Sequence, residues 1–166
     1  MYKRQDLLGY CELSANPVGE LVLHVFGVAT PDRIALSDRV CSALQLAEHW
    51  QDVGEDFRKG RVYLPAEDLR GFGVSHADLA PAETGGALRE LLGFEVSRAR
   101  ELLDSGAGLV GRLSGRARIA VAGYVGGGRA TLDAIAAADY DVLASAPKAS
   151  AQRMLLATVR TYGRGK

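Results

Sequence analysis

Residues 44–65 read LQLAEHWQDVGEDFRKGRVYLP. Within this stretch Glu48, Asp52 and Asp56 follow one another at intervals of four residues, a spacing that stacks their carboxylates on one face of a helix. Neighbouring carboxylates on a helix repel by a few tenths of a kcal/mol per pair, so a compensating interaction is expected. A solvated surface is the commoner explanation of such a charge run. The alternative is a bound divalent cation, because Mg²⁺ prefers hard oxygen ligands and bridges carboxylates to a diphosphate.

The sequence around this stretch is helical. Thr30 and Pro31 form a helix start, and the apolar periodicity continues to Lys59 and a closing Gly60, which predicts one long central helix. Strand alternation is essentially absent, so the predicted fold class is all-α. The other predicted helices are 6–14, a helix with Asn16 as N-cap and Pro17 at its first position, 66–70, 87–113, 115–138 and 149–161.

Composition limits the function classes. The chain has 166 residues, of which 48% are hydrophobic, and this suits one globular domain with a sizeable core. Its 20 basic and 20 acidic side chains give no net charge, which argues against a nucleic-acid partner. The two cysteines lack metal or redox spacing, and neither a signal peptide nor a membrane-spanning run of about 20 apolar residues is present. We therefore expect a cytoplasmic protein.

Three stretches resemble the motifs of a known family, and they occur in the family's order. Residues 45–65 resemble the second aspartate-rich motif of the squalene/phytoene synthase family. Residues 10–27, YCELSANPVGELVLHVFG, resemble its Tyr-Cys helix, and YDVL at 140–143 resembles its C-terminal signature. The segments LSANPVG and ALQLAEHWQDV are most similar to the hydroxysqualene synthases of bacterial hopanoid biosynthesis.

This resemblance implies the C-terminal portion of the isoprenoid synthase helical fold around a central cavity. It also implies Mg²⁺ as cofactor and an isoprenoid diphosphate as substrate. The reaction implied for this branch converts presqualene diphosphate and water to hydroxysqualene and diphosphate. Head-to-head condensation of prenyl diphosphates, as in squalene or phytoene synthases, and a non-catalytic assembly factor remain alternatives.

The resemblance also assigns roles to individual residues. Asp52 and Asp56 would be metal ligands with Glu48 beside them, although relatives carry Asn at the Glu48 position. The residues that would contact substrate are Ala15, Val18, Gly19, Gln45 and Arg61. Tyr10 and Tyr63 would be catalytic. For all of these except the acidic residues, ordinary packing or a solvated charge remains the alternative. His49 next to the acidic residues is a further, weaker candidate.

The family's first aspartate-rich motif does not occur in the chain. We therefore expect residues 6–166 to be the C-terminal part of a single domain and expect the 166-residue chain alone to be inactive. MYKRQ, residues 1–5, back-translates with a GTG start to the end of a transposon adaptor used for sequencing libraries. Our hypothesis is that these five residues are not biological.

Two segments stay open to two interpretations each. Residues 150–166, SAQRMLLATVRTYGRGK, predict either a packing helix with a basic end or a peripheral contact with the inner face of the membrane. Gly126, Gly127 and Gly128 interrupt a predicted helix without a phosphate-loop context. They indicate close helix packing or the approach of a bulky ligand.

Overall fold

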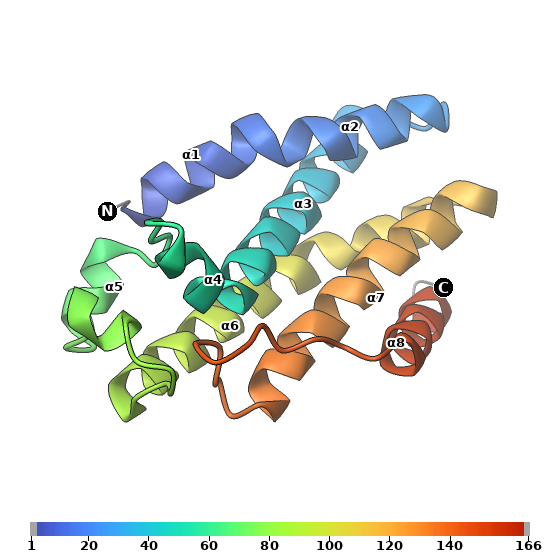
Figure 1. Ribbon diagram of the computed structural model, residues 1–166. Coiled ribbons are helices and arrows are strands. Elements are labelled where there is room, and N and C mark those ends of the chain that lie inside the picture. The colour runs from blue at the N-terminus through green and yellow to red at the C-terminus, as the bar shows by residue number, and fades with distance from the viewer. Residues whose placement is uncertain (1–2, 165–166) are drawn as a thin grey trace.

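The computed structural model describes residues 3–164, and within them every regular element is helical (Figure 1). The all-α prediction is therefore confirmed. The elements are α1 Arg4–Ser14, α2 Asn16–Val25, α3 Pro31–Gln51, α4 Val53–Arg58, α5 Ala66–Gly71, η1 His76–Leu79, α6 Gly86–Gly106, η2 Ala107–Arg112, α7 Gly115–Ala137 and α8 Ala151–Arg164. Met1 and Tyr2, part of the adaptor hypothesis, and Gly165 and Lys166 of the basic tail lie outside the described residues.

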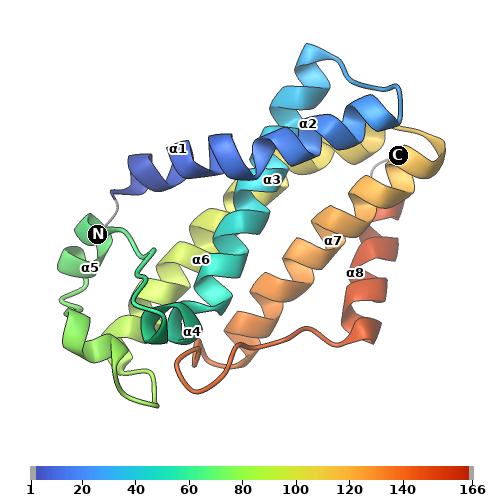
Figure 2. The same ribbon diagram turned by 45° about the horizontal axis from the view of Figure 1, so that its top comes forward.

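Helix α3 is the central element of the molecule. It packs against α2, α6 and α7, while α8 packs along α7 (Figure 1). Figure 2 shows α1 and α2 running across α3, with α8 on the far side of α7. The largest fully buried side chains include Trp50 of α3, Leu91 and Leu103 of α6, and Ile135 of α7. This burial holds α3 in the core and leaves Gln45 and Glu48 on a less buried face.

The predicted helix from Pro31 to Lys59 is interrupted at Asp52, which differs from the sequence prediction. Asp52 has φ −101° and ψ 13°, outside the helical region, and separates α3 from α4. The hydrogen-bond ladder nevertheless continues, since the Asp52 N–H donates to the Glu48 carbonyl at 2.9 Å and the Asp56 N–H donates to the Asp52 carbonyl at 2.8 Å. The interruption therefore changes the direction of the last turn, while the backbone hydrogen bonds continue through it. The predicted stop at Gly60 is confirmed by its φ of +76°.

The start of α2 also differs in detail from the prediction. Helix α2 begins at Asn16, and Ala15 occupies the cap position without a side-chain capping bond. The Asn16 side chain instead accepts a hydrogen bond from the Ser42 hydroxyl at 3.0 Å. It thus links α2 to α3 and does not cap its own helix.

Two of the three consecutive glycines serve helix packing. A Cβ atom at Gly126 would lie 2.6 Å from the Thr158 backbone, so α8 crosses α7 at this point. A Cβ at Gly128 would lie 2.6 Å from a Leu44 methyl group. Close packing, one of the two interpretations, is therefore confirmed at these positions. None of the helices formed by residues 3–164 is long and apolar enough to cross a bilayer.

Candidate functional site

A cavity of about 550 Å³ lies between α2, α3 and α7. Four of the predicted substrate-contacting residues, Ala15, Val18, Gly19 and Gln45, line it. The remaining lining is predominantly apolar and is contributed by Ser14, Val22, Leu23, Ser37, Val40, Cys41, Leu44, Ala47, Glu48, Gln51, Leu109, Val121, Gly123, Tyr124, Gly127, Gly128, Thr131 and Met154. Such a lining suits a hydrocarbon chain.

Gly19 has a packing role as well as a place in the cavity wall. A Cβ atom at this position would collide with the Cys41 Sγ and the Ser37 Oγ atoms of α3. A larger residue would therefore push α2 away from α3. Both interpretations of Gly19, helix packing and cavity lining, are compatible with its position.

One edge of the cavity is polar. Gln45, Glu48 and Gln51 face it from successive turns of α3, and Asp52 follows directly at the helix end. Asp52 is half-buried, and its pKa is raised by burial and by the negative charges of Glu55 and Asp56. This edge therefore concentrates negative charge where the apolar wall ends.

Lys148 partly offsets that charge. Its ammonium group acts with Lys59 to lower the pKa of Asp52, against the larger upward effects. Lys148 belongs to the segment that follows YDVL, where the family resemblance implies a basic residue and Lys148 is the weak candidate that the sequence offers. The tertiary structure brings this cation to the acidic helix end from almost a hundred residues further along the chain.

Asp56 faces a second, smaller hollow, which shares no lining residue with the main cavity. This hollow is also lined by His49, Arg61 and Tyr63. The Arg61 N–H donates to the Asp56 carbonyl at 2.8 Å, which folds the chain back at the end of α4. The two aspartates thus lie one turn apart, and two of the predicted site residues, Arg61 and Tyr63, gather around the second of them.

The donor set suits Mg²⁺ in chemical type but is incomplete. Glu48, Asp52 and Asp56 offer hard carboxylate oxygens. The pKa of Asp52 is raised first by burial and then by repulsion from Glu55 and Asp56, and a bound cation would relieve that repulsion. Over residues 3–164, however, no three Asp, Glu, His or Cys side chains converge into a group able to hold a metal ion. An ion at this edge would need oxygens from substrate, water or another segment.

The predicted catalytic tyrosines form a three-ring cluster with a histidine. The His49 and Tyr63 rings are stacked, with centroids 3.9 Å apart and planes 19° apart. The Tyr10 ring centroid lies 6.1 Å from that of His49 and 6.5 Å from that of Tyr63. Tyr10 is 41% exposed, so the cluster has one accessible aromatic edge. These rings provide the quadrupoles that can stabilise a nearby cation.

His49 is the member of this cluster that sequence analysis weighted least. Burial lowers its pKa, with Asp56 acting in the opposite direction, so the imidazole is neutral at pH 7. Its Nε2 atom lies 3.4 Å from the side-chain nitrogen of Gln45, one turn earlier on α3. The i,i+4 spacing of Gln45 and His49 was the available sequence signal, whereas the stack on Tyr63 depends on the chain returning after α4.

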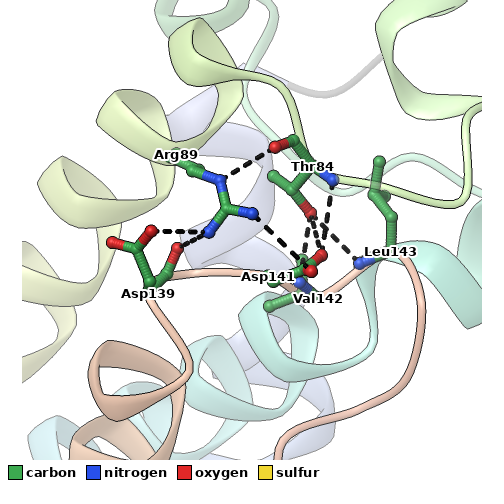
Figure 3. A network of polar contacts seen from close by, with 6 residues as sticks. All are labelled: Thr84, Arg89, Asp139, Asp141, Val142 and Leu143. Atoms are coloured by element: carbon green, nitrogen blue, oxygen red, sulfur yellow. Dashed lines mark hydrogen bonds and ion pairs between the residues drawn. The ribbon is translucent and has the colours of Figure 1, made fainter.

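The YDVL segment forms a structural brace (Figure 3). The buried Thr84 hydroxyl donates to Asp141 Oδ1 at 2.8 Å and accepts the N–H groups of Val142 at 3.2 Å and Leu143 at 3.3 Å. Arg89 donates to the Thr84 carbonyl at 2.8 Å and pairs with Asp141 at 3.6 Å. These contacts join the loop after α7 to the start of α6. Sequence analysis did not single out Thr84.

The brace in turn contacts α4. A Cβ atom at Gly54 would lie 2.6 Å from the Leu143 carbonyl oxygen, so α4 and the loop meet backbone to backbone. Arg58 Nη1 donates to the same carbonyl at 3.2 Å, and the Gln51 amide donates to the Pro147 carbonyl. The turn that carries the two aspartates is therefore held from both ends.

Comparisons with known proteins agree with this geometry. The squalene/phytoene synthase family model matches residues 1–155. Hydroxysqualene synthase of Sinorhizobium fredii is 36% identical over 109 residues, covering 65% of this chain and 37% of the relative. Chloroplastic phytoene synthase 2 of Zea mays is 31% identical over 166 residues, covering 96% of this chain and 41% of the relative.

A solved structure shares the fold. The crystal structure of squalene synthase HpnC from Alicyclobacillus acidocaldarius superposes with a TM-score of 0.79 at 39% identity, covering 84% of this chain and 53% of that one. The chain thus spans well under two thirds of the relatives and of the structure that it matches. From its motifs, its helical fold and these matches together, the chain belongs to the squalene/phytoene synthase family.

Proposed function

We propose that this chain supplies the diphosphate-binding edge and part of the apolar cavity of a Mg²⁺-dependent isoprenoid synthase that converts presqualene diphosphate and water to hydroxysqualene and diphosphate. The observation that carries the proposal is that the acidic series of α3 and α4 begins at the wall of the apolar cavity. Glu48 lines the cavity, and Asp52 and Asp56 follow it along the helix. A prenyl diphosphate has the same division into an apolar chain and a charged end.

In this proposal Asp52 and Asp56, with Glu48, would hold Mg²⁺ at the diphosphate end of the substrate. The bound ion supplies charge neutralisation at the leaving group. Around the hydrocarbon, Ala15, Val18 and the other apolar side chains exclude water from the developing carbocation.

The aromatic cluster lies beside the acidic residues and serves the cationic part of the reaction. Tyr10 and Tyr63 present ring faces and edges to a passing positive charge. Neutral His49 stacks on Tyr63 and lies within 6.1 Å of the Tyr10 ring, centroid to centroid. A neutral imidazole can accept a proton from water when water captures the cation.

Head-to-head condensation of prenyl diphosphates is the second candidate. The match to phytoene synthase 2 over 96% of this chain favours it, whereas the 36% identity to a hydroxysqualene synthase favours the first. Both reactions use the same division of the site into an acidic edge and an apolar cavity. Substrate choice therefore separates them.

The test supplies presqualene diphosphate and farnesyl diphosphate separately, with Mg²⁺ and with a chelator. Turnover is measured on the longest protein that the gene encodes, and Mg²⁺-dependent binding of presqualene diphosphate is measured on this chain by calorimetry. We expect hydroxysqualene from presqualene diphosphate. Consumption of farnesyl diphosphate alone would instead establish the condensing activity.

The metal edge is tested with a matched pair of variants. Asp52→Asn should reduce Mg²⁺-dependent turnover at least about 100-fold, since it removes a charge aimed at the leaving group. Glu55→Gln removes an acidic charge from the same turn, but Glu55 is exposed and pairs with Lys59 at 2.6 Å, so turnover should be retained. Unchanged turnover in Asp52→Asn would favour the assembly-factor alternative.

A further inference from the structure

Helix α8 carries an apolar stripe that faces outward. Leu155, Leu156 and Val159 are 66%, 49% and 60% exposed. At 100° per residue they occupy an arc of about 100° on the helix. Thr161, which is 3% exposed, lies about opposite the centre of that arc and marks the face that packs on α7. The outward position of the stripe thus follows from the packing of the inner face.

The inner face of α8 is firmly attached, so the stripe has a fixed orientation. Arg129 of α7 donates to the Thr161 hydroxyl at 2.9 Å. Arg118 donates to the Tyr162 carbonyl at 2.8 Å, and its guanidinium lies 4.4 Å from the centroid of the Tyr162 ring. Gly126 allows the two helix backbones to approach closely. In Figure 2, α8 accordingly lies along the outer side of α7.

Arginines border this stripe on one side. In helical projection Arg160 lies about 40° beyond Leu156, and Arg153 and Arg164 follow within about another 40°. All three are exposed. Residues 142–166 contain five basic residues and no acidic one, although the whole chain has no net charge. The charge asymmetry is therefore local to this end of the chain.

We propose that this face of α8, defined by Leu155, Leu156 and Val159 with Arg153, Arg160 and Arg164, docks onto an anionic lipid bilayer surface. Apolar side chains enter the acyl boundary while the arginines bind lipid phosphates, and this combination of two weak signals gives stable interfacial attachment. A second copy of the same face is a poorer partner, because a symmetric contact would bring the arginines of both copies together.

Attachment of α8 to a bilayer would bring the cavity close to the lipid. Met154, in the first turn of α8, lines the cavity and is also 45% exposed. The apolar cavity and the docking face therefore belong to the same helix, which is about 10 Å across. Docking would place the cavity wall next to the acyl chains, where an apolar substrate or product resides.

The experiment is a flotation assay of the full chain with vesicles. One set contains phosphatidylcholine alone and the other contains equal parts of phosphatidylcholine and phosphatidylglycerol. We expect binding to the anionic vesicles that weakens with added salt, and at least about tenfold weaker partition to phosphatidylcholine alone. Equal partition to both vesicle types, or no flotation with either, would overturn the proposal. Vesicle binding requires no turnover, so this result is independent of the proposed function.

Two pairs of variants separate the apolar and the charged contributions. Leu155→Glu/Val159→Glu should lower partition about tenfold or more. Its control, Leu21→Glu/Val25→Glu, alters equally exposed residues of α2, which lacks flanking arginines, and should bind like the parent chain. Arg153→Gln/Arg160→Gln should lower partition about 25-fold, since each basic residue near an anionic surface contributes roughly a factor of five. Its control is Arg39→Gln/Arg70→Gln.

Competing occupants give different results. If the α8 face joins two copies, Leu155→Glu/Val159→Glu converts a dimer to a monomer in size-exclusion chromatography and leaves vesicle partition unchanged, which would overturn the proposal. An equal loss of vesicle partition in Leu21→Glu/Val25→Glu would also overturn the proposal, because it would show non-specific adsorption. Circular dichroism melts of each variant confirm that partition is compared between folded proteins.

Discussion

The backbone of Gly54 lies against the backbone of Leu143, so closely that a Cβ atom at position 54 would be 2.6 Å from the Leu143 carbonyl oxygen. Gly54 is midway between Asp52 and Asp56, and Leu143 ends the YDVL segment. The two motifs, almost ninety residues apart in the chain, therefore form one contact. The position of the acidic turn depends on that contact.

Gly54→Ala should destabilise the protein by about 1–3 kcal/mol, because the added methyl group meets backbone atoms that cannot move aside. The free energy of unfolding in urea measures the effect. Gly9→Ala is the matched control: Gly9 lies inside α1, and a Cβ atom there would have no neighbour within 4 Å, so this change should stabilise by up to about 1 kcal/mol. Equal effects of the two substitutions would contradict the backbone contact.

Thr84→Val should cost about 2–3 kcal/mol of unfolding free energy. The substitution keeps the shape of the side chain but leaves the buried N–H groups of Val142 and Leu143 without their acceptor. Urea denaturation of the two proteins measures the loss. For comparison, Thr158→Val removes a hydroxyl that only bonds back to the Met154 carbonyl in its own helix, so its effect should be within about 0.5 kcal/mol. A neutral Thr84→Val would refute the bracing role of Thr84.

Glu95→Gln should stabilise the protein increasingly as the pH rises from 5 to 8. Burial, together with the side-chain hydrogen bond to Asp68, raises the pKa of Glu95 to about 8, so the folded state holds a proton that the unfolded state releases above the ordinary glutamate pKa of 4.5. The unfolding free energy of the parent chain therefore decreases as the pH rises from 4.5 to about 8, by up to about 5 kcal/mol. The glutamine side chain of the variant removes this decrease.

Thermal or urea unfolding at several pH values checks the Glu95 prediction. Glu90→Gln, an exposed residue of the same helix, should leave the pH dependence of the parent chain unchanged. Parallel pH profiles for Glu95→Gln and the parent chain would show that Glu95 is ionised in the folded state at neutral pH.

His49→Phe should reduce the loss of unfolding free energy that the parent chain shows at acidic pH. Burial lowers the pKa of His49 in the folded state, so the unfolded state binds the proton more readily and the stability of the parent chain falls as the pH drops below about 6.5. Phenylalanine keeps a ring to stack on Tyr63 but cannot be protonated. His24→Phe removes an exposed imidazole instead and should retain the acid loss. Unfolding free energies between pH 7 and pH 5 distinguish the two variants.

Much of the site was predictable because its parts are local in sequence. The spacing of Glu48, Asp52 and Asp56 predicted an acidic helix face. The family resemblance placed Tyr10, Ala15, Val18 and Gly19 on a cavity wall, and all of these except Tyr10 line the cavity in the structure. A three-to-four-residue period specifies which side chains share a helix face. The metal ligation predicted for the acidic residues stays a prediction.

The tertiary structure decided the rest. The interruption at Asp52 places the acidic turn against Leu143, and the stack of His49 on Tyr63 forms because the chain turns back after α4. Thr84 became significant only as the partner of a loop 57 residues away. The sequence alone determined the helices, their faces and the family, since these depend on local periodicity and motifs. Contacts between distant segments depend on which helix faces pack together, which no local pattern specifies.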